Sequence, residues 1–131
     1  MAEHPNVRLI RKLHESFVEG SYIAAITELF AQDVVWRLPG SGPLSGDHRG
    51  RDAVLAAMRR FEELSGGTIR VEVHDILAND EHAVALLRAK GRRGEKRYDS
   101  PEIDVYHIKG GKVTEFWSFA EDQRATDAFW S

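Results

Sequence analysis

The stretch that most constrains the fold spans residues 96–122 and predicts a long β-hairpin. Two runs rich in apolar and aromatic residues, 103–108 and 113–119, flank a Lys-Gly-Gly turn, which is a strong hairpin signal. We predict a three-residue loop at 109–111 that closes on a bulge, because glycine adopts the left-handed conformation that such a loop requires.

The register of this hairpin decides which side chains share a face. The predicted loop places four pairs of residues opposite one another: Ile108 and Lys112, Tyr106 and Thr114, Asp104 and Phe116, and Glu102 and Ser118. Because side chains alternate along a strand, one face carries Asp104, Tyr106, Phe116 and Ser118. The other face carries Ile103, Val105, His107, Trp117 and Phe119. Since both faces are largely apolar, we expect each to be covered by a partner surface.

Length and composition predict a single domain over residues 1–131. The chain is 42% hydrophobic and 30% charged, which is typical of a soluble globular protein. The net charge is −3 and basic residues cluster only at 88–97, so we expect no nucleic-acid partner. No apolar run approaches the roughly 20 residues of a membrane span, and the N-terminus lacks the apolar core of a signal peptide. We therefore expect a cytoplasmic protein without a membrane partner.

The hydrophobic patterns predict helices first and then a meander of strands. Helical spacing marks residues 6–19, 22–30 (with Ser21 as N-cap) and 51–65, and a short terminal helix fits 121–130. Strand patterns mark residues 34–38, 68–78 and 83–90, followed by the two strands of the hairpin. The order α-α-β-α-β-β-β-β predicts an α+β fold in which one curved antiparallel sheet wraps around the N-terminal helices.

Two connecting segments allow different interpretations. Residues 39–50 are rich in glycine, proline and serine and form a long loop, which could be a lid or binding loop or a simple crossover. Residues 91–96 are charged and predict a solvated hairpin tip.

Asp104 is the best candidate for a catalytic residue. An acid between Ile103 and Val105 on a long strand is unusual for a core position. If it faces the helices, burial should raise its pKa, and it could then act as a base or donate a hydrogen bond to an oxyanion. The alternative is that Asp104 faces solvent or pairs with a lysine or arginine.

The remaining patterns favour a cavity without metal or cofactor. The six histidines lack metal-ligand spacing, cysteine is absent, and the glycines of 39–50 match no nucleotide-binding pattern. His14 could face a cavity or be an ordinary core histidine. Apolar and aromatic residues on the helices and the sheet could form an ordinary core or line a pocket. The predicted pocket residues are Phe17, Trp36, Leu38, Met58, Phe61, Val71, Tyr106, Phe116 and Ser118.

Five local phrases in this order resemble the SnoaL-like and ketosteroid isomerase-like branch of the nuclear transport factor 2-like superfamily. They are FAQDVVWRLPG, a long loop ending in GRDAV, EIDVYHI, GGKVTEFW and EDQRATDAFW, and the resemblance covers nearly all of residues 6–130. It implies a cone-shaped α+β barrel with a deep apolar cavity. It also implies a homodimer, formed through the outer sheet face that carries Trp117 and Phe119.

The resemblance also suggests roles for individual positions. EIDVYHI resembles the isomerase strand that carries an aspartic acid in the oxyanion hole, and Asp104 falls on it. The isomerase base and tyrosine would fall near Leu38 and Leu13, which cannot transfer protons, so steroid isomerisation is not expected. Limonene epoxide hydrolase-like members use an aspartate that would fall near Ser118, so epoxide hydrolysis is not expected either. Polyketide cyclase chemistry needs one acid–base residue, a role that Asp104 could fill with Tyr106 or His14 assisting.

The leading hypothesis is a dimeric cavity protein that binds a small, mostly apolar carbonyl or polycyclic compound. If it is an enzyme, it transfers a proton without a cofactor, as an isomerase, cyclase or hydratase does, with Asp104 as acid–base residue. The alternatives are a non-catalytic binding module and a structural dimer whose pocket is filled by side chains.

Overall fold

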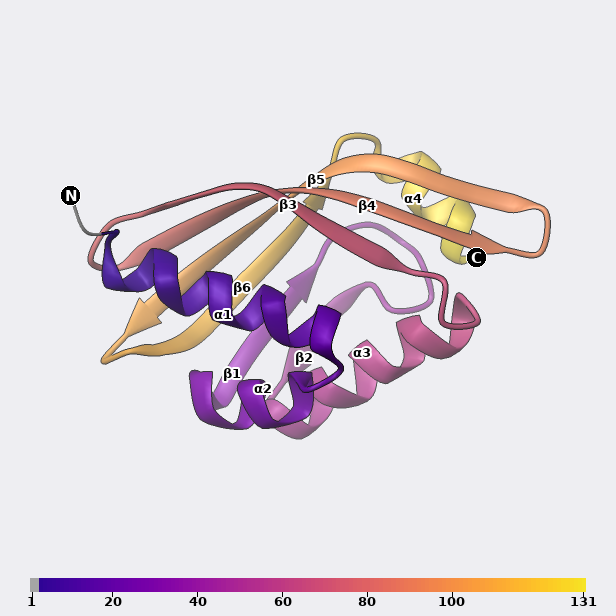
Figure 1. Cartoon of the computed structure of the whole chain (residues 1–131). Helices are drawn as coiled ribbons and strands as arrows, with labels where there is room; N and C mark the ends of the chain where they lie inside the picture. The colour runs from indigo at the N-terminus through magenta and orange to yellow at the C-terminus, as the bar shows by residue number, and fades with distance from the viewer. Residues whose placement is uncertain (1–2) are drawn as a thin grey trace.

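The computed structural model describes residues 3–131 and shows one curved, unclosed sheet packed against helices (Figure 1). The strands in spatial order are β2 (Gly46–Arg49), β1 (Phe30–Leu38), β6 (Lys112–Ala120), β5 (Lys96–Lys109), β4 (His82–Arg93) and β3 (Arg70–Ala78). The helices are α1 (Pro5–Glu19), α2 (Tyr22–Leu29), α3 (Arg51–Leu64) and α4 (Gln123–Trp130). The first three lie along one side of the sheet, and α4 lies near the β4–β5 turn (Figure 1). The predicted α+β cone is therefore confirmed.

The sheet differs from the prediction in two respects. It is mixed rather than antiparallel, because β1 runs parallel to β6 and pairs Trp36 with Phe116. It also contains β2, which lies in the segment predicted as a loop and pairs with the edge of β1. The sequence of β2, Gly-Asp-His-Arg, has no apolar residue. An exposed edge strand held by backbone hydrogen bonds needs no apolar pattern, so periodicity could not reveal it.

The predicted hairpin is present, but its turn and register were wrong. Gly110 and Gly111 both have positive φ (58° and 75°) and form a two-residue turn between Lys109 and Lys112. Such a turn follows the right-handed twist of the strands. The bulge lies further along the hairpin, beside His107.

The corrected register keeps the predicted faces. Asp104 pairs with Ser118, and Tyr106 pairs with Phe116. The difference from the predicted pairing is two residues, which equals the period of side-chain alternation. The four residues predicted to share a face therefore still share it.

The core forms as two clusters on the helix side of the sheet. The larger one joins α1, α2, α3 and the sheet, with Ile10, Ile26, Val34, Val54 and Val113 fully buried. The smaller one joins Ala89 and Tyr98 of the sheet to Phe129 and Trp130 of α4. Since Phe61 packs against both clusters, α3 links them.

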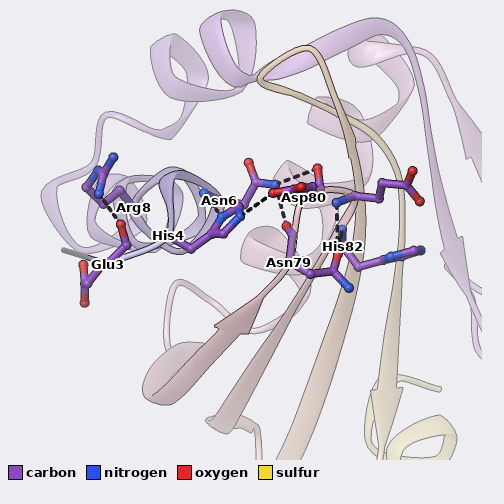
Figure 2. A network of polar contacts seen from close by, with 8 residues as sticks. Glu3, His4, Asn6, Arg8, Asn79, Asp80 and His82 are labelled. Carbon is purple, nitrogen blue, oxygen red and sulfur yellow. Dashed lines mark hydrogen bonds and ion pairs between the residues drawn. The ribbon is translucent and has the colours of Figure 1, made fainter. Parts of the chain in front are cut away.

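Polar contacts fix the start of α1 against the β3–β4 turn (Figure 2). His4 Nδ1 accepts a hydrogen bond from the backbone N–H of Asn6 (3.0 Å), and its Nε2 lies 2.9 Å from Asp80 Oδ1. The Asn6 side chain donates to the backbone oxygens of Asn79 (2.9 Å) and Asp80 (3.2 Å). These contacts set where α1 crosses the sheet, and hence which of its residues face β5.

The tip of the β4–β5 hairpin is charged and mostly exposed, as the sequence predicted, but Arg93 on it also has a structural role. The strands continue to Arg93 and Lys96, which pair with each other. Arg93 donates to the backbone oxygens of Leu64 (3.0 Å) and Phe129 (2.6 Å), at the ends of α3 and α4. A cation stabilises the unpaired carbonyls at a helix C-terminus. The sequence shows that Arg93 is charged, but the helix C-termini to which it donates hydrogen bonds lie far from it along the chain.

Within residues 3–131, no helix is long and apolar enough to span a membrane.

Candidate functional site

A cavity of about 600 Å³ lies between the sheet, the helices and the loop that follows β1. Its size is within the range of pockets for small organic ligands. Asp104 lies on its wall, and so do all the predicted pocket residues: Phe17, Trp36, Leu38, Met58, Phe61, Val71, Tyr106, Phe116 and Ser118. The structure thus brings the predicted residues together around one space, and their role in binding remains a prediction.

Three stacked aromatic rings form a row in the cavity wall. Phe116 of β6 stacks on Trp36 of β1 with ring centroids 5.2 Å apart and planes 13° apart. On its other side, Phe116 stacks on Tyr106 of β5 at 5.5 Å and 15°. The sheet order explains the row, because the three residues are direct neighbours on adjacent strands. Because the rings cover one another's faces, this row presents mainly ring edges to the cavity, which suits an apolar ligand.

Ser118 and Phe61 complete this region. The indole Nε1–H of Trp36 donates to Ser118 Oγ at 3.0 Å, which satisfies its polar group inside the cavity. The ring of Phe61 in α3 lies 5.8 Å from that of Trp36, tilted by 54°. Aromatic groups therefore approach the cavity from both the sheet and α3.

A line of hydrogen bonds connects α1 to the candidate acid on β5. The Tyr106 hydroxyl donates to Asp104 Oδ2 at 3.0 Å, and His14 Nε2 lies 3.2 Å from the same hydroxyl oxygen. Because Tyr106 has only one hydroxyl proton, His14 must be the donor in the second contact. Burial lowers the pKa of His14 to about 4, so its imidazole is neutral at pH 7. His14 lies on the cavity wall and is also a buried, hydrogen-bonded histidine, so both interpretations of the sequence hold in part.

Asp104 has the environment of a functional carboxyl group rather than that of an ion-paired one. Burial raises the pKa of Asp104 to about 6, and hydrogen bonds from Ser118 and Tyr106 oppose part of that rise. Its residue surface is half-buried because the carboxyl group faces the cavity. Among residues 3–131, no lysine or arginine forms an ion pair with Asp104. The structure thus contradicts the ion-paired alternative.

Sequence reasoning missed a second acid on the cavity wall. The Tyr98 hydroxyl donates to Glu102 Oε2 at 2.7 Å and lies 2.9 Å from Thr126 Oγ1 of α4. Burial raises the pKa of Glu102 to about 7; the hydrogen bond from Tyr98 opposes this rise and the charge of Asp104 adds to it. The period-two alternation that placed Asp104 also places Glu102 on this face. Because the residues around Pro101 are mostly polar, the sequence did not indicate that the Glu102 side chain would face a cavity.

The loop after β1 closes one side of the cavity and is fastened to α4. Asp127 accepts hydrogen bonds from the backbone N–H and the hydroxyl group of Ser41 (2.9 and 3.1 Å), and from Gln123 Nε2 (2.9 Å). These bonds hold the pKa of Asp127 below its ordinary value. Gln123 also donates to the Pro39 oxygen at 3.3 Å. Since this loop and α4 both line the cavity, the segment is a wall of the site rather than a remote crossover.

No group of three or more histidine, aspartate or glutamate side chains gathers as metal ligands in the part of the chain that the structure describes.

A curved α+β cone around such a cavity defines the class of nuclear transport factor 2-like proteins. Within that class, the SnoaL-like domain model matches residues 10–116, so the chain belongs to the SnoaL-like family. The suspected resemblance is confirmed.

Three known proteins illustrate the relationship. The chain is 32% identical to the uncharacterized protein Rv0034 of Mycobacterium tuberculosis over the whole of both chains. It is 30% identical to Bal32a, from a soil-derived mobile gene cassette, with a TM-score of 0.92 over 97% of each chain. TerC, whose structure was determined in co-crystals with polyporic acid, is 17% identical with a TM-score of 0.83 over 96% of this chain and 98% of TerC. The likeness to TerC concerns the fold alone.

Proposed function

We propose that this protein binds a small, mostly apolar carbonyl or polycyclic compound in its cavity and transfers a proton on it without a cofactor. Asp104 is the acid–base residue of this proposal. The observation that carries it is a carboxyl group that faces an aromatic cavity, accepts a hydrogen bond from the Tyr106 hydroxyl at 3.0 Å and has no ion-pair partner among residues 3–131. Proton transfer by a positioned side chain is most effective when its pKa lies near the working pH, and the pKa of Asp104 is about 6.

The protonation state of Asp104 sets its role. Above about pH 6 the group is a carboxylate and can remove a proton from a carbon next to a carbonyl group. Below that pH it is neutral and can donate a hydrogen bond to a developing oxyanion. At neutral pH the proposal assigns it the role of base. Tyr106 keeps the carboxyl group oriented, and the neutral His14 fixes Tyr106 in turn.

The cavity wall supports the proposed class of ligand. The stacked rings of Trp36, Phe116 and Tyr106 give the wall a row of apolar ring edges, which fits a mostly apolar compound. The volume of about 600 Å³ fits a small molecule rather than a polymer. TerC has the same fold and was co-crystallized with polyporic acid, which is consistent with a ligand site in such a cone.

A homodimer is part of the same proposal. The outer face of β5 and β6 carries Ile103 and Phe119, which are 41% and 44% exposed, beside Trp117. Neighbouring exposed apolar residues on a sheet face favour coverage by another surface. In this proposal a second copy of the chain covers that face, while the cavity opens on the other side.

The test is deuterium incorporation into 2-tetralone, a bicyclic ketone, followed by proton NMR in buffered D₂O at pD 7.5. We expect the wild-type protein to speed exchange of the protons next to the carbonyl. Asp104→Asn should reduce that acceleration by about 10²–10⁴-fold, the usual contribution of a positioned acid–base group. Glu95→Gln is the matched control, because Glu95 is exposed in the β4–β5 turn.

Two outcomes would contradict the catalytic proposal. Equal rates for the wild type and Asp104→Asn would remove Asp104 from the reaction. Tight binding of the ketone, seen as quenching of tryptophan fluorescence, with exchange no faster than in buffer would favour the alternative of a non-catalytic binding module.

A further inference from the structure

The cavity contains two buried acids on one strand, and the proposed function uses only one of them. Glu102 and Asp104 are two residues apart on β5, so their side chains leave the same face of the sheet. At a rise of about 3.3 Å per residue, their Cα atoms are roughly 6.6 Å apart. Both side chains lie on the cavity wall. A bound molecule can therefore meet both carboxyl groups.

Within residues 3–131, the surroundings of Glu102 supply a hydrogen-bond donor but no cation paired with it. Its neighbours across the sheet are Leu87 on β4 and Ala120 on β6, neither of which is charged. The titratable groups that face it are Tyr98, which donates a hydrogen bond at 2.7 Å, and Asp104.

The other charged groups on the cavity wall are Glu19, Glu62, Arg70 and Asp127. Asp127 is bound to Ser41 and Gln123. Within residues 3–131, Glu102 forms no ion pair with lysine, arginine or histidine. Burying an acid without a cationic partner costs free energy, so stability does not account for its presence.

We infer that Glu102 is a second catalytic residue. It acts as a general acid on the same ligand from which Asp104, as the base, takes a proton. This inference rests on the proposed function. In the step, the Asp104 carboxylate takes the proton from a carbon next to the ligand's carbonyl, and that C–H bond breaks. Its electron pair becomes the C=C bond of an enol while the carbonyl π pair moves to oxygen. Glu102 gives its proton to that oxygen, so the ligand's charge is unchanged.

The geometry defines the ligand more narrowly than the cavity alone does. Each carboxyl group needs to lie within about 3 Å of the atom with which it exchanges a proton. Since the two acids leave the same strand face from neighbouring positions of the alternation, one carbonyl unit bound against that face can reach both side chains. The ligand is thus a ketone whose oxygen points to the Tyr98–Glu102 side, and whose acidic C–H group points to Asp104 and the stacked rings.

The protonation states agree with this division of roles. Burial raises the pKa of both acids, to about 6 for Asp104 and about 7 for Glu102, so each can give up or take a proton near neutral pH. The charge of Asp104 itself helps to keep Glu102 protonated.

The first test is the pD profile of 2-tetralone exchange for the wild type, Glu102→Gln and Asp104→Asn. We expect a bell-shaped profile for the wild type, with its acidic limb set by Asp104 and its basic limb by Glu102. Glu102→Gln should lower the rate at least tenfold and lose the basic limb. If Asp104→Asn abolishes exchange while Glu102→Gln keeps the wild-type rate and profile, the inference fails and the proposed function stands.

The second test needs no substrate. Carboxyl-resolved NMR titration of ¹³C-labelled protein should show that the pKa of Glu102 falls in Asp104→Asn, because a neighbouring negative charge has been removed. It should rise in Tyr98→Phe, because a hydrogen bond to the carboxylate has been lost. Glu95→Gln should change neither value. If the Glu102 titration is the same in Asp104→Asn as in the wild type, the two acids do not act as a pair and the inference is overturned.

Discussion

Replacing Asp104 with asparagine should make the protein more stable at neutral pH, although it should abolish proton transfer. Asparagine has nearly the same shape as aspartate but carries no charge. The half-buried wild-type carboxylate has no ion-paired lysine or arginine within residues 3–131, so ionising it in the folded state carries a desolvation cost. Asparagine removes that cost and can still accept the hydrogen bond from Tyr106.

The pKa shift gives the magnitude and the sign of the effect. The pKa of Asp104 rises from 3.8 to about 6 in the folded protein. At 1.36 kcal/mol per pH unit, this corresponds to about 3 kcal/mol of lost stability above pH 6. Because the folded state binds the proton more tightly, the wild-type free energy of unfolding falls as pH rises from about 4 to about 6. Asp104→Asn should lack this decrease.

The assay is urea unfolding followed by tryptophan fluorescence at several pH values between 4 and 8. Protein concentration should be held fixed, because dimerisation would make stability concentration-dependent. We expect the variant and the wild type to be similar near pH 4 and to differ by about 3 kcal/mol at pH 7 and above. The fall in the pKa of Glu102 that follows loss of the Asp104 charge acts in the same direction. Glu95→Gln should give no pH-dependent difference.

A stability difference that stays constant from pH 4 to pH 8 would refute this reasoning. It would mean that the Asp104 carboxyl group has the same proton affinity in the folded and unfolded states. A variant that becomes less stable than the wild type as pH rises would show that the carboxylate is stabilised in the fold, and the role of Asp104 as a base with a raised pKa would fail.

Two further predictions concern the cavity wall and the outer face. Gly40→Ala should lower the free energy of unfolding by about 1–3 kcal/mol, because φ at this position is +94°. The new methyl group would meet the side chains of Gln123 and Asp127, so amide hydrogen exchange in α4 should become faster. Gly46→Ala is the control, because φ at Gly46 is also positive (+114°) but the space around it is open. Similar amide hydrogen exchange in α4 in the two variants would argue against the contact between residue 40 and α4. Ile103→Glu should convert the proposed dimer to a monomer in sedimentation velocity, and an unchanged sedimentation coefficient would place any dimer contact elsewhere.

The sequence alone predicted the α+β layout and most of the cavity wall. Alternation along the hairpin placed Asp104, Tyr106, Phe116 and Ser118 on one face, and a wrong register did not change that result because it was wrong by one full period. Helical spacing likewise gave α1 and α3 their buried faces. These features depend on residues close together in the chain, so local patterns were sufficient to predict them.

Only the tertiary structure decided which groups meet across the cavity. The contact between His14 and Tyr106 joins residues 92 positions apart, and the row of rings exists because β1 runs beside β6. The pairing of Tyr98 with Glu102 was hidden for another reason, because a polar stretch shows no burial until α4 and the loop after β1 cover it. Alternation fixes the side of a strand on which a residue lies. Packing between distant segments decides what covers that side of the strand. It therefore also decides whether an acid there is shielded from water enough to change its pKa.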